Sequence, residues 1–344
     1  MASDRYIFIL LLFFSVKSFG QIGGESTYQF LELTNSARVA ALGGNQIAIN
    51  DSSDLNLPYH NPSLLGAGMR GQFLVNYVNY FADVKYGYAS YAPALNIPGN
   101  IAFGMHYINY GKFREATEDG SLTGNTFKAA EYALNLIYSN QYKRWHYGMN
   151  LKPVLSIFES YQSFGLVADL GISISSKKGL TTVGFVARNI GGQITPYYKN
   201  GHIEQVPFDL QFGVSKRLEH APLVIFLTAQ HLNRWDLANP EGDKDSGTDE
   251  YLFYGPTESL AKQLMRHIVF GIELLPSDNF TIRAGYNYQR RQELVFGEKN
   301  STVGFSLGFG FKVKRFRFDF GTSRFHLAGS SNLFSMAINL SDDF

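Results

Sequence analysis

The chain contains two short motifs whose residue types could do nucleophilic chemistry. Ser175-Ser176-Lys177-Lys178 has the spacing Ser-x-x-Lys, and Ser277-Asp278-Asn279 spells Ser-Asp-Asn. Together these motifs are typical of penicillin-binding enzymes, which use the Ser as an acyl-transfer nucleophile. That chemistry needs the Ser at the start of a helix in an α/β domain. Both motifs fall in predicted turns and the sequence has no Lys-Thr-Gly element, so we reject this chemistry.

Other patterns that could bind a metal, a phosphate or a substrate are equally weak. The 8 His are scattered without ligand spacing, and the chain has 0 Cys. Gly304, Gly308 and Gly310 lie along one alternating segment with no helix after it, which argues against a phosphate loop. A Ser-His-Asn hydrolase on a barrel wall would need lipid-facing polar residues, and we can nominate none. The sequence therefore predicts no catalytic residue, no cofactor, no metal site and no enzyme activity.

Composition limits the class of protein. The chain has 344 residues and a formal net charge of +1, so it has no global field that would attract nucleic acid. Aromatic residues make up 15% of the sequence, and there are 34 Gly. Such a mixture favours strands, turns and membrane-interface aromatic belts over helical bundles.

The N-terminus is typical of an export signal. Arg5 precedes an apolar run over residues 6–14, and Ser18 and Gly20 supply small residues before Gln21. We expect residues 1–20 to be a cleaved signal peptide; a retained N-terminal anchor is the alternative. No run of 18 apolar residues follows Gln21. A membrane protein in the mature chain must then be a β-barrel, because only helices and closed barrels satisfy the backbone in lipid.

From Gly71 onward the hydrophobic period is two, which is typical of strands. Residues 303–313 alternate Val, Phe and Leu with Gly, Ser and Lys. A soluble sandwich would bury the aromatic face, whereas a membrane barrel would turn it to lipid. The predicted strands are long enough to span a membrane, where tilted strands need about 9–11 residues. They cover 71–80, 84–94, 100–110, 128–140, 144–156, 163–175, 180–190, 207–219, 221–233, 264–275, 279–290, 301–313, 315–325 and 332–343.

The connections between these segments favour the barrel. Short turns follow every second strand, and longer links lie between them at 111–127, 157–162, 191–206, 234–263, 291–300 and 326–331. The first link, 81–83, is short and is the exception. Short periplasmic turns that alternate with longer outer loops are typical of outer-membrane barrels. The chain ends with an amphipathic segment and Phe344, which is similar to the terminal aromatic read by the barrel-assembly machinery. We predict an all-β antiparallel barrel of about 14 strands over residues 71–344.

Two links carry aromatic residues that could bind a partner. The alternative is that both are solvated loops, but exposed aromatic clusters are costly and can serve as interface anchors. The candidate partner-binding residues are Trp235, Tyr251, Phe253, Tyr254, Tyr197 and Tyr198.

Residues 21–70 lack the period-two pattern and are predicted to form an N-terminal plug. Residues 34–42 are expected to include a short helix that ends at Gly43. The candidate plug residues are Ser36, Arg38, Leu42, Gly43 and Gly44.

The same region resembles the PorQ family of the Bacteroidetes type IX secretion system. The matching residues are Gly23-Gly24-Glu25-Ser26-Thr27-Tyr28-Gln29-Phe30-Leu31, the small-residue run 36–44, and Asn61-Pro62. The family and its relative PorV look like the FadL fold, a 14-stranded barrel with an N-terminal plug. The resemblance implies outer-membrane lipid as surroundings and proteins resembling PorZ, PorU and PorV as partners. It also implies lipopolysaccharide as a further partner.

Two functions from different classes follow. The first is a plugged barrel that anchors a surface attachment complex through its outer loops. The second is a FadL-like transporter for hydrophobic small molecules, which needs a continuous apolar lumen. The predicted inward side chains favour the first function, because they include Lys152, Arg283, Lys312, Arg315, Arg317 and Asp319.

Overall fold

The computed structural model describes most of the chain. The described residues are 26–80, 84–117, 119–199, 201–235, 237, 259–294, 302–326 and 329–340. The predicted signal peptide at 1–20 and Phe344 therefore lie outside the described residues.

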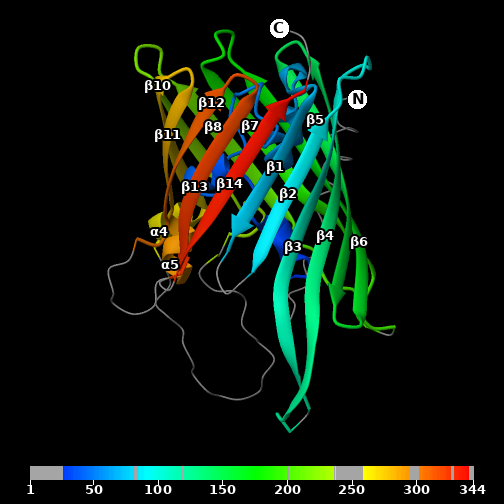
Figure 1. The fold of residues 1–344 in the computed structure, drawn as a ribbon. Coiled ribbons are helices and arrows are strands. Elements are labelled where there is room, and N and C mark those ends of the chain that lie inside the picture. The colour runs from blue at the N-terminus through cyan, green and yellow to red at the C-terminus, as the bar shows by residue number, and fades with distance from the viewer. Residues whose placement is uncertain are drawn as a thin grey trace, which may run out of the picture.

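Fourteen antiparallel strands form a closed barrel in which each strand pairs with its neighbours in the chain, and β1 pairs with β14 (Figure 1). The predicted fold class is confirmed. The strands are β1 (Gln72–Asn79), β2 (Lys85–Ala92), β3 (Asn100–Ala116), β4 (Leu122–Tyr142), β5 (Trp145–Phe158), β6 (Tyr161–Ser175), β7 (Thr181–Thr195), β8 (Asp209–Arg217), β9 (Leu223–Ala229), β10 (Ile268–Ser277), β11 (Phe280–Asn287), β12 (Phe305–Val313), β13 (Phe316–His326) and β14 (Gly329–Asn339).

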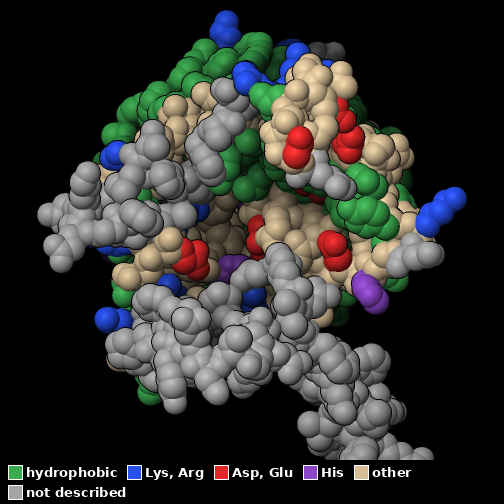
Figure 2. Space-filling view, turned by 90° about the horizontal axis from the view of Figure 1, so that it is seen from below, with side chains coloured by type: hydrophobic (Ala, Val, Ile, Leu, Met, Phe, Trp, Pro, Cys, Tyr) green, Lys and Arg blue, Asp and Glu red, His purple; other side chains and the backbone are tan. Residues whose placement is uncertain are grey.

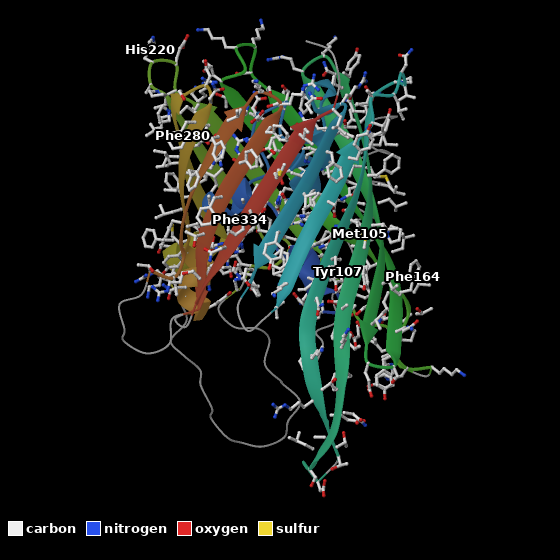
Figure 3. The ribbon with its side chains drawn as sticks, viewed as in Figure 1. Met105, Tyr107, Phe164, His220, Phe280 and Phe334 are labelled. Carbon is white, nitrogen blue, oxygen red and sulfur yellow. The ribbon has the colours of Figure 1, made fainter. Side chains whose placement is uncertain are left out.

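The alternation in the sequence places apolar side chains on the outside of the barrel. In β1, Phe73, Val75 and Tyr77 are 40%, 44% and 46% exposed, whereas Leu74 and Val78 are fully buried. Figure 3 shows the same arrangement around the wall, where labelled side chains such as Phe280 and Phe334 point outward. A closed wall with an apolar outside and satisfied backbone groups suits a bilayer, so the strands span a membrane. Among the described helices, none is long and apolar enough to cross a membrane.

The two ends of the barrel differ. Short turns join β4 to β5, β6 to β7, β8 to β9, β10 to β11 and β12 to β13 at one end, and β14 also finishes there (Figure 1). The longer connections lie at the opposite end. We call these the short-turn end and the long-link end. This asymmetry matches the predicted alternation in part. The links between β7 and β8, β9 and β10, and β11 and β12 are long as predicted, whereas β6 begins at Tyr161 directly after a turn at 159–160 and β14 begins at Gly329, so the predicted links 157–162 and 326–331 were wrong.

Further predicted boundaries were wrong at the arm and at two strand ends. The link predicted at 111–127 is mostly strand: β3 and β4 continue past the other strands as a long hairpin arm (Figure 1), and Phe113 stacks on Phe127. The predicted strand ends at 264–267 and 288–290 are helical instead. They belong to α4 (Leu260–His267) and α5 (Tyr288–Leu294), whose Leu, Gln, Arg and Glu residues are good helix formers.

Residues 26–70, called here the N-terminal segment, lie inside the barrel (Figure 1). They form five short helices rather than strands. These are η1 (Gln29–Glu32), α2 (Ala37–Ala41), α3 (Leu57–His60), η2 (Pro62–Leu64) and η3 (Ala67–Met69). The Ser36 side chain caps α2 by accepting a hydrogen bond from the Val39 N–H, and Gly43 follows the helix with φ of 103°. The predicted short helix and its glycine end are thus confirmed.

Candidate functional site

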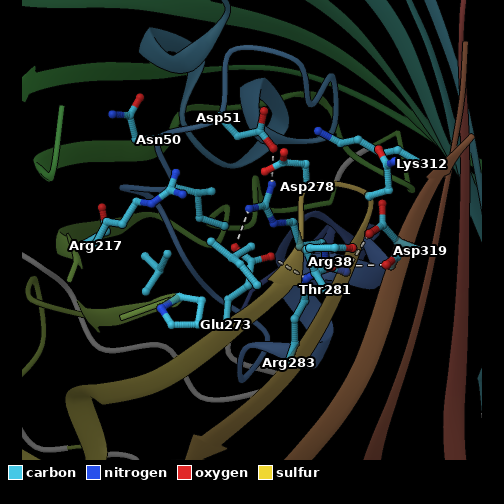
Figure 4. Close-up of a pocket in the computed structure, with 18 of the residues that line it drawn as sticks. Arg38, Asn50, Asp51, Arg217, Glu273, Asp278, Thr281, Arg283, Lys312 and Asp319 are labelled. Atoms are coloured by element: carbon cyan, nitrogen blue, oxygen red, sulfur yellow. Dashed lines mark hydrogen bonds and ion pairs between the residues drawn. The ribbon is translucent and has the colours of Figure 1, made fainter. Parts of the chain in front are cut away.

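A buried cation joins the N-terminal segment to the barrel wall. Arg38 of α2 is only 5% exposed. One guanidinium nitrogen lies 2.7 Å from Asp51 and 2.9 Å from Asp54, both in the N-terminal segment. The other lies 2.7 Å from Glu273 on β10 (Figure 4). A single side chain therefore connects two acidic residues of the segment to one acidic residue of the wall.

Two wall arginines extend this contact into a network. Arg283 on β11 lies 2.7 Å from Glu273 and 2.6 Å from Asp319 on β13. Arg317, also on β13, lies 2.9 Å from Asp319 and 3.0 Å from Asp51. Both arginines are buried, so each must keep its partners to avoid an uncompensated charge in the interior. We call these three arginines, Asp51, Asp54, Glu273 and Asp319 the lumen network.

The charges of the lumen network nearly balance. Three arginines face four carboxylates, and Lys312 lies beside them with its ammonium 3.3 Å from the Ser53 hydroxyl. Burial alone would raise the pKa of Asp51, but Arg317 and Arg38 outweigh it and hold that pKa well below its usual range. Asp51 is therefore ionised at neutral pH, as the pairing requires.

Glycines in the wall let α2 approach the strands closely. A Cβ on Gly285 of β11 would overlap the backbone of Leu42 and Gly43, and a Cβ on Gly321 of β13 would overlap the Ala37 carbonyl. Larger side chains at these positions would push the helix away from the wall. These two inward-facing glycines thus provide the space in which α2 packs against the wall.

A second contact fixes the segment to the opposite wall. Asn61 accepts hydrogen bonds from the backbone and hydroxyl of Ser63 and donates one to the Ile47 carbonyl. The Asn61-Pro62 step packs on Gly148 of β5 and Gly171 of β6, where any Cβ would collide with it. The segment is therefore held on two sides of the lumen.

Between these contacts lies a buried cluster around His60, which ends α3. Neither ring nitrogen of His60 has a hydrogen-bond partner. Burial, reinforced by the positive charge of Arg188, lowers the pKa of His60 to about 3. The neighbouring Tyr59 hydroxyl pairs with Nδ1 of His106 at 2.9 Å. His60 is consequently neutral at physiological pH and packs as a ring rather than acting as a base.

Cavities lie between the segment and the wall in the described part of the chain. The larger, about 680 Å³, lies toward the short-turn end beside the lumen network (Figure 4), and its lining includes Arg38, Arg217 and Lys312. The smaller, about 320 Å³, is lined by residues that include Arg188 and Asp209. Figure 2 looks into the long-link end and shows acidic and His side chains around a hollow. Charged and amide groups line both cavities, beside apolar side chains such as Val224 and Phe226 in the larger one, so a hydrocarbon would have to displace water from the polar groups.

No group of His, Asp and Glu among the described residues is arranged to hold a metal ion. The rejected Ser-Asp-Asn motif lies where it was predicted, because Asp278 and Asn279 form the turn between β10 and β11. The paired Lys178 and Glu219 are exposed and lie 2.7 Å apart at the same end of the barrel.

The candidate partner residues behave differently from one another. Tyr198 is 60% exposed and Trp235 is 57% exposed, both at the long-link end. Tyr197 is half-buried and donates a hydrogen bond to the Ser156 hydroxyl at 2.7 Å, so its hydroxyl is already used inside the barrel. The remaining candidates lie outside the described residues, namely Tyr251, Phe253 and Tyr254.

The candidate plug residues all lie in the lumen, but only Arg38 makes an ionic contact with the wall. Sequence reasoning missed its partners Asp51, Asp54 and Glu273. One signal was available, because Glu273 falls on the inward parity of a strand with an apolar outward face. An acidic residue at such a position needs a cation from elsewhere in the chain. Of the predicted inward residues, Lys152, Arg283, Arg317 and Asp319 are buried and Lys312 is half-buried, whereas Arg315 is exposed in a turn.

Comparison with known proteins shows the fold. No family model matches the chain, and no curated protein matches its sequence. A deletion mutant of the TodX monoaromatic hydrocarbon channel has a TM-score of 0.53 and 12% identity, covering 88% of this chain and 98% of its own. The CymD monoaromatic hydrocarbon channel has a TM-score of 0.50 and 12% identity, covering 91% and 97%. A Pseudomonas aeruginosa FadL homologue has a TM-score of 0.48 and 10% identity, covering 90% and 99%. The chain thus shares the barrel fold of TodX and CymD, and identities this low show the fold alone.

Proposed function

We propose that this chain is a non-enzymatic outer-membrane barrel that anchors a protein complex at the cell surface, as its resemblance to the PorQ family of the type IX secretion system implies. The observation that carries the proposal is the lumen network. It ties the N-terminal segment to the wall through Arg38, Asp51 and Glu273 at distances of 2.7 Å. In this proposal residues 1–20 are a signal peptide, 21–70 a permanent plug and 71–344 the barrel.

The partner would dock at the long-link end, which faces the outside in this proposal. Exposed aromatic side chains in such connections are suited to be interface anchors. Tyr198 and Trp235 meet this description among the described residues. The ring of Trp235 lies 6.0 Å from that of His267, which holds it in a defined position at the rim. The expected partners are proteins resembling PorZ, PorU and PorV.

The test is co-purification from membranes with the double variant Tyr198→Ala and Trp235→Ala. If these side chains anchor the complex, loss of both should reduce the free energy of binding by about 2 kcal/mol or more. The variant should then bind the surface partner at least about thirtyfold more weakly, and less partner should co-purify with it. Tyr142→Ala is the matched control, because Tyr142 is 65% exposed at the short-turn end. Undiminished recovery with the double variant would count against this docking surface.

A second function is favoured by the fold. TodX and CymD are named as monoaromatic hydrocarbon channels, and their likeness to this chain supports a channel for hydrophobic small molecules. This support comes from the shape of the barrel and extends to no lining residue. The polar linings of the two cavities oppose it, because hydrophobic transport needs a continuous apolar path.

The wall also bears on the channel hypothesis, because a transporter could release its cargo sideways through a break in the strand pairing. The pairing of β7 with β8 ends at Arg188, and Asn189 then adopts φ of 56°. One contact bridges this break, from Asn189 to Pro207, and two others hold Asn189 against β5 and β6. The Asn189 side chain donates to the Pro207 carbonyl at 2.8 Å and accepts from Lys152 at 2.5 Å, and its N–H donates to Asp169 at 2.8 Å. A bridged break supports a sealed wall and therefore the anchor.

The two functions separate in one preparation. Purified protein in liposomes should give no uptake of toluene or a fatty acid above protein-free liposomes if it is an anchor. Uptake that saturates with substrate would instead support the channel and contradict the permanent plug. The co-purification assay is carried out on the same protein, so each function can fail independently.

A further inference from the structure

The hairpin arm of β3 and β4 carries a positively charged surface on its outward side. Inward and outward faces are fixed by burial: Ile108 and Ala129 are buried, so Asn109 and Lys128 next to them face outward. Paired residues on antiparallel strands share a face. Lys112 pairs with Lys128 and therefore also faces outward, beyond a bulge in β3.

Two more cations share this face. Arg114 pairs with Thr126, which is two residues from Lys128 and lies on its side of the strand. Lys85 on β2 pairs with Asn109 on the outward side. All four cations are exposed. We call Lys85, Lys112, Arg114 and Lys128 the outward cationic patch.

The patch lies next to the lipid-facing band, on its side toward the long-link end. Tyr107 and Tyr132 are a cross-strand pair on the outward face, with ring centroids 4.9 Å apart, and Tyr77 is at the same level on β1. Such a row of Tyr is typical of the membrane interface. Figure 3 shows Tyr107 on the outer face of β3, below Met105 and toward the arm. Each two residues along a strand advance about 6.6 Å, so the patch begins within one such step of the belt.

The pairing within the patch is unfavourable for the protein alone. Lys112 lies directly opposite Lys128, and like charges at directly opposed positions destabilise a hairpin. No described carboxylate forms an ion pair with any of the four cations. Two acidic residues are adjacent. The Glu159 N–H donates to the Lys128 carbonyl at 3.2 Å, and the Glu115 carboxylate accepts hydrogen bonds from Thr123 and Asn125. An anion from outside the chain would relieve this repulsion.

We infer that the outward cationic patch binds the phosphate groups of a phosphorylated glycolipid, of the lipid A type, in the leaflet that surrounds the long-link end. The position of the patch favours a membrane lipid as its ligand. The patch faces outward from the barrel wall, on the long-link side of the aromatic belt, where a membrane lipid is the neighbour. Its acyl chains would lie along the apolar wall on the short-turn side of Tyr107 and Tyr132. Lys and Arg hold phosphate through charge-assisted hydrogen bonds, and basic residues at the membrane surface contribute to lipid affinity additively.

The experiment measures retention of bis-phosphorylated lipid A by the purified full-length protein in detergent, using native mass spectrometry. The variant Lys112→Gln with Lys128→Gln should bind lipid A about thirtyfold more weakly than the unmodified protein. The matched control is Lys177→Gln with Lys178→Gln, which removes the same charge from the exposed turn at the short-turn end and should leave binding unchanged. Heat-modifiable migration on gels checks that both variants keep the closed barrel.

A second arm uses lipid A from which both phosphates have been removed. The unmodified protein should bind this lipid as weakly as the Lys112→Gln, Lys128→Gln variant binds the phosphorylated form. Equal retention of phosphorylated lipid A by that variant and by the control would overturn the inference. Equal binding of the two lipids by the unmodified protein would also overturn it, because acyl chains would then carry the affinity. The inference needs only a membrane-spanning barrel, so it can fail or succeed independently of partner docking.

Discussion

Removal of Arg38 should release the N-terminal segment from the wall. In Arg38→Gln, Glu273 keeps only Arg283, while Asp51 and Asp54 keep only Arg317. Loss of one partner from a buried ionic cluster typically costs about 3–5 kcal/mol, since it leaves charge uncompensated in the interior. Because each carboxylate retains one arginine, we expect the lower end of that range, about 3 kcal/mol. This corresponds to a change of roughly a hundredfold in the equilibrium between seated and displaced segment.

Planar-bilayer conductance measures this equilibrium, because a displaced segment opens the lumen to ions. Unmodified protein should remain closed, whereas Arg38→Gln should open in bursts and unfold at a lower urea concentration. Lys178→Gln is the matched control, since it breaks the pair with Glu219, whose side chains are 71% and 51% exposed. Exposed pairs contribute about 1 kcal/mol or less, so this control should remain closed.

A second substitution makes the reasoning refutable. Glu273→Gln in the Arg38→Gln background removes one of the uncompensated negative charges and should restore part of the closed state. If Arg38→Gln matches Lys178→Gln in both conductance and urea midpoint, the lumen network does not hold the segment. If the double variant is more open than Arg38→Gln, the remaining charges are not what destabilises the single variant.

Two further predictions concern the same segment. His60 binds a proton below about pH 6.5 in the unfolded state, but in the folded state only near its pKa of about 3. Between these values the free energy of unfolding should therefore fall with falling pH, by up to about 1.4 kcal/mol per pH unit. His60→Gln should reduce this slope in urea unfolding measured at about pH 7 and about pH 5, and an unchanged slope would contradict a neutral buried ring. The valine side chain of Gly321→Val should clash with the Ala37 carbonyl and destabilise the bound N-terminal segment by about 1–3 kcal/mol. The control is Gly192→Ala, because a Cβ at Gly192 meets no atom within 4 Å. Equal urea midpoints for the two variants would show that the close approach is not required.

The barrel could be predicted from the sequence because its cause is local. Each strand carries its own period-two pattern, and the outward residues of β1 alternate with buried ones along the whole strand. The arm was missed for a different reason. Beyond Gly111 the strands have no acyl chains on one side and no core on the other, so exposed residues such as Lys112 and Arg114 give no hydrophobic alternation. Pairing with β4 defines strand there, and pairing is not visible in a single segment.

The lumen network could not be predicted because its members are far apart in the chain. Arg38 and Glu273 are separated by 235 positions, and the contact exists only because the barrel closes around the segment. The sequence does show that charged residues such as Arg283 and Asp319 fall on inward parity. It does not show which of them meets which, because strand parity fixes a face but neither the height nor the partner across the lumen.

The likeness to hydrocarbon channels and the polar lumen are compatible, because different physical requirements act on the barrel wall and on its filling. The filling is the N-terminal segment together with the inward side chains of the strands. Outward residues of the wall must suit lipid in any membrane barrel, so two proteins can share the wall at 12% identity. Inward residues have no such common demand and are free to differ with function. In this chain they supply Glu273 and Arg317, which pair with charges of the N-terminal segment. Function should therefore be assigned from the filling, and the ionic contacts of this filling favour a barrel that stays closed.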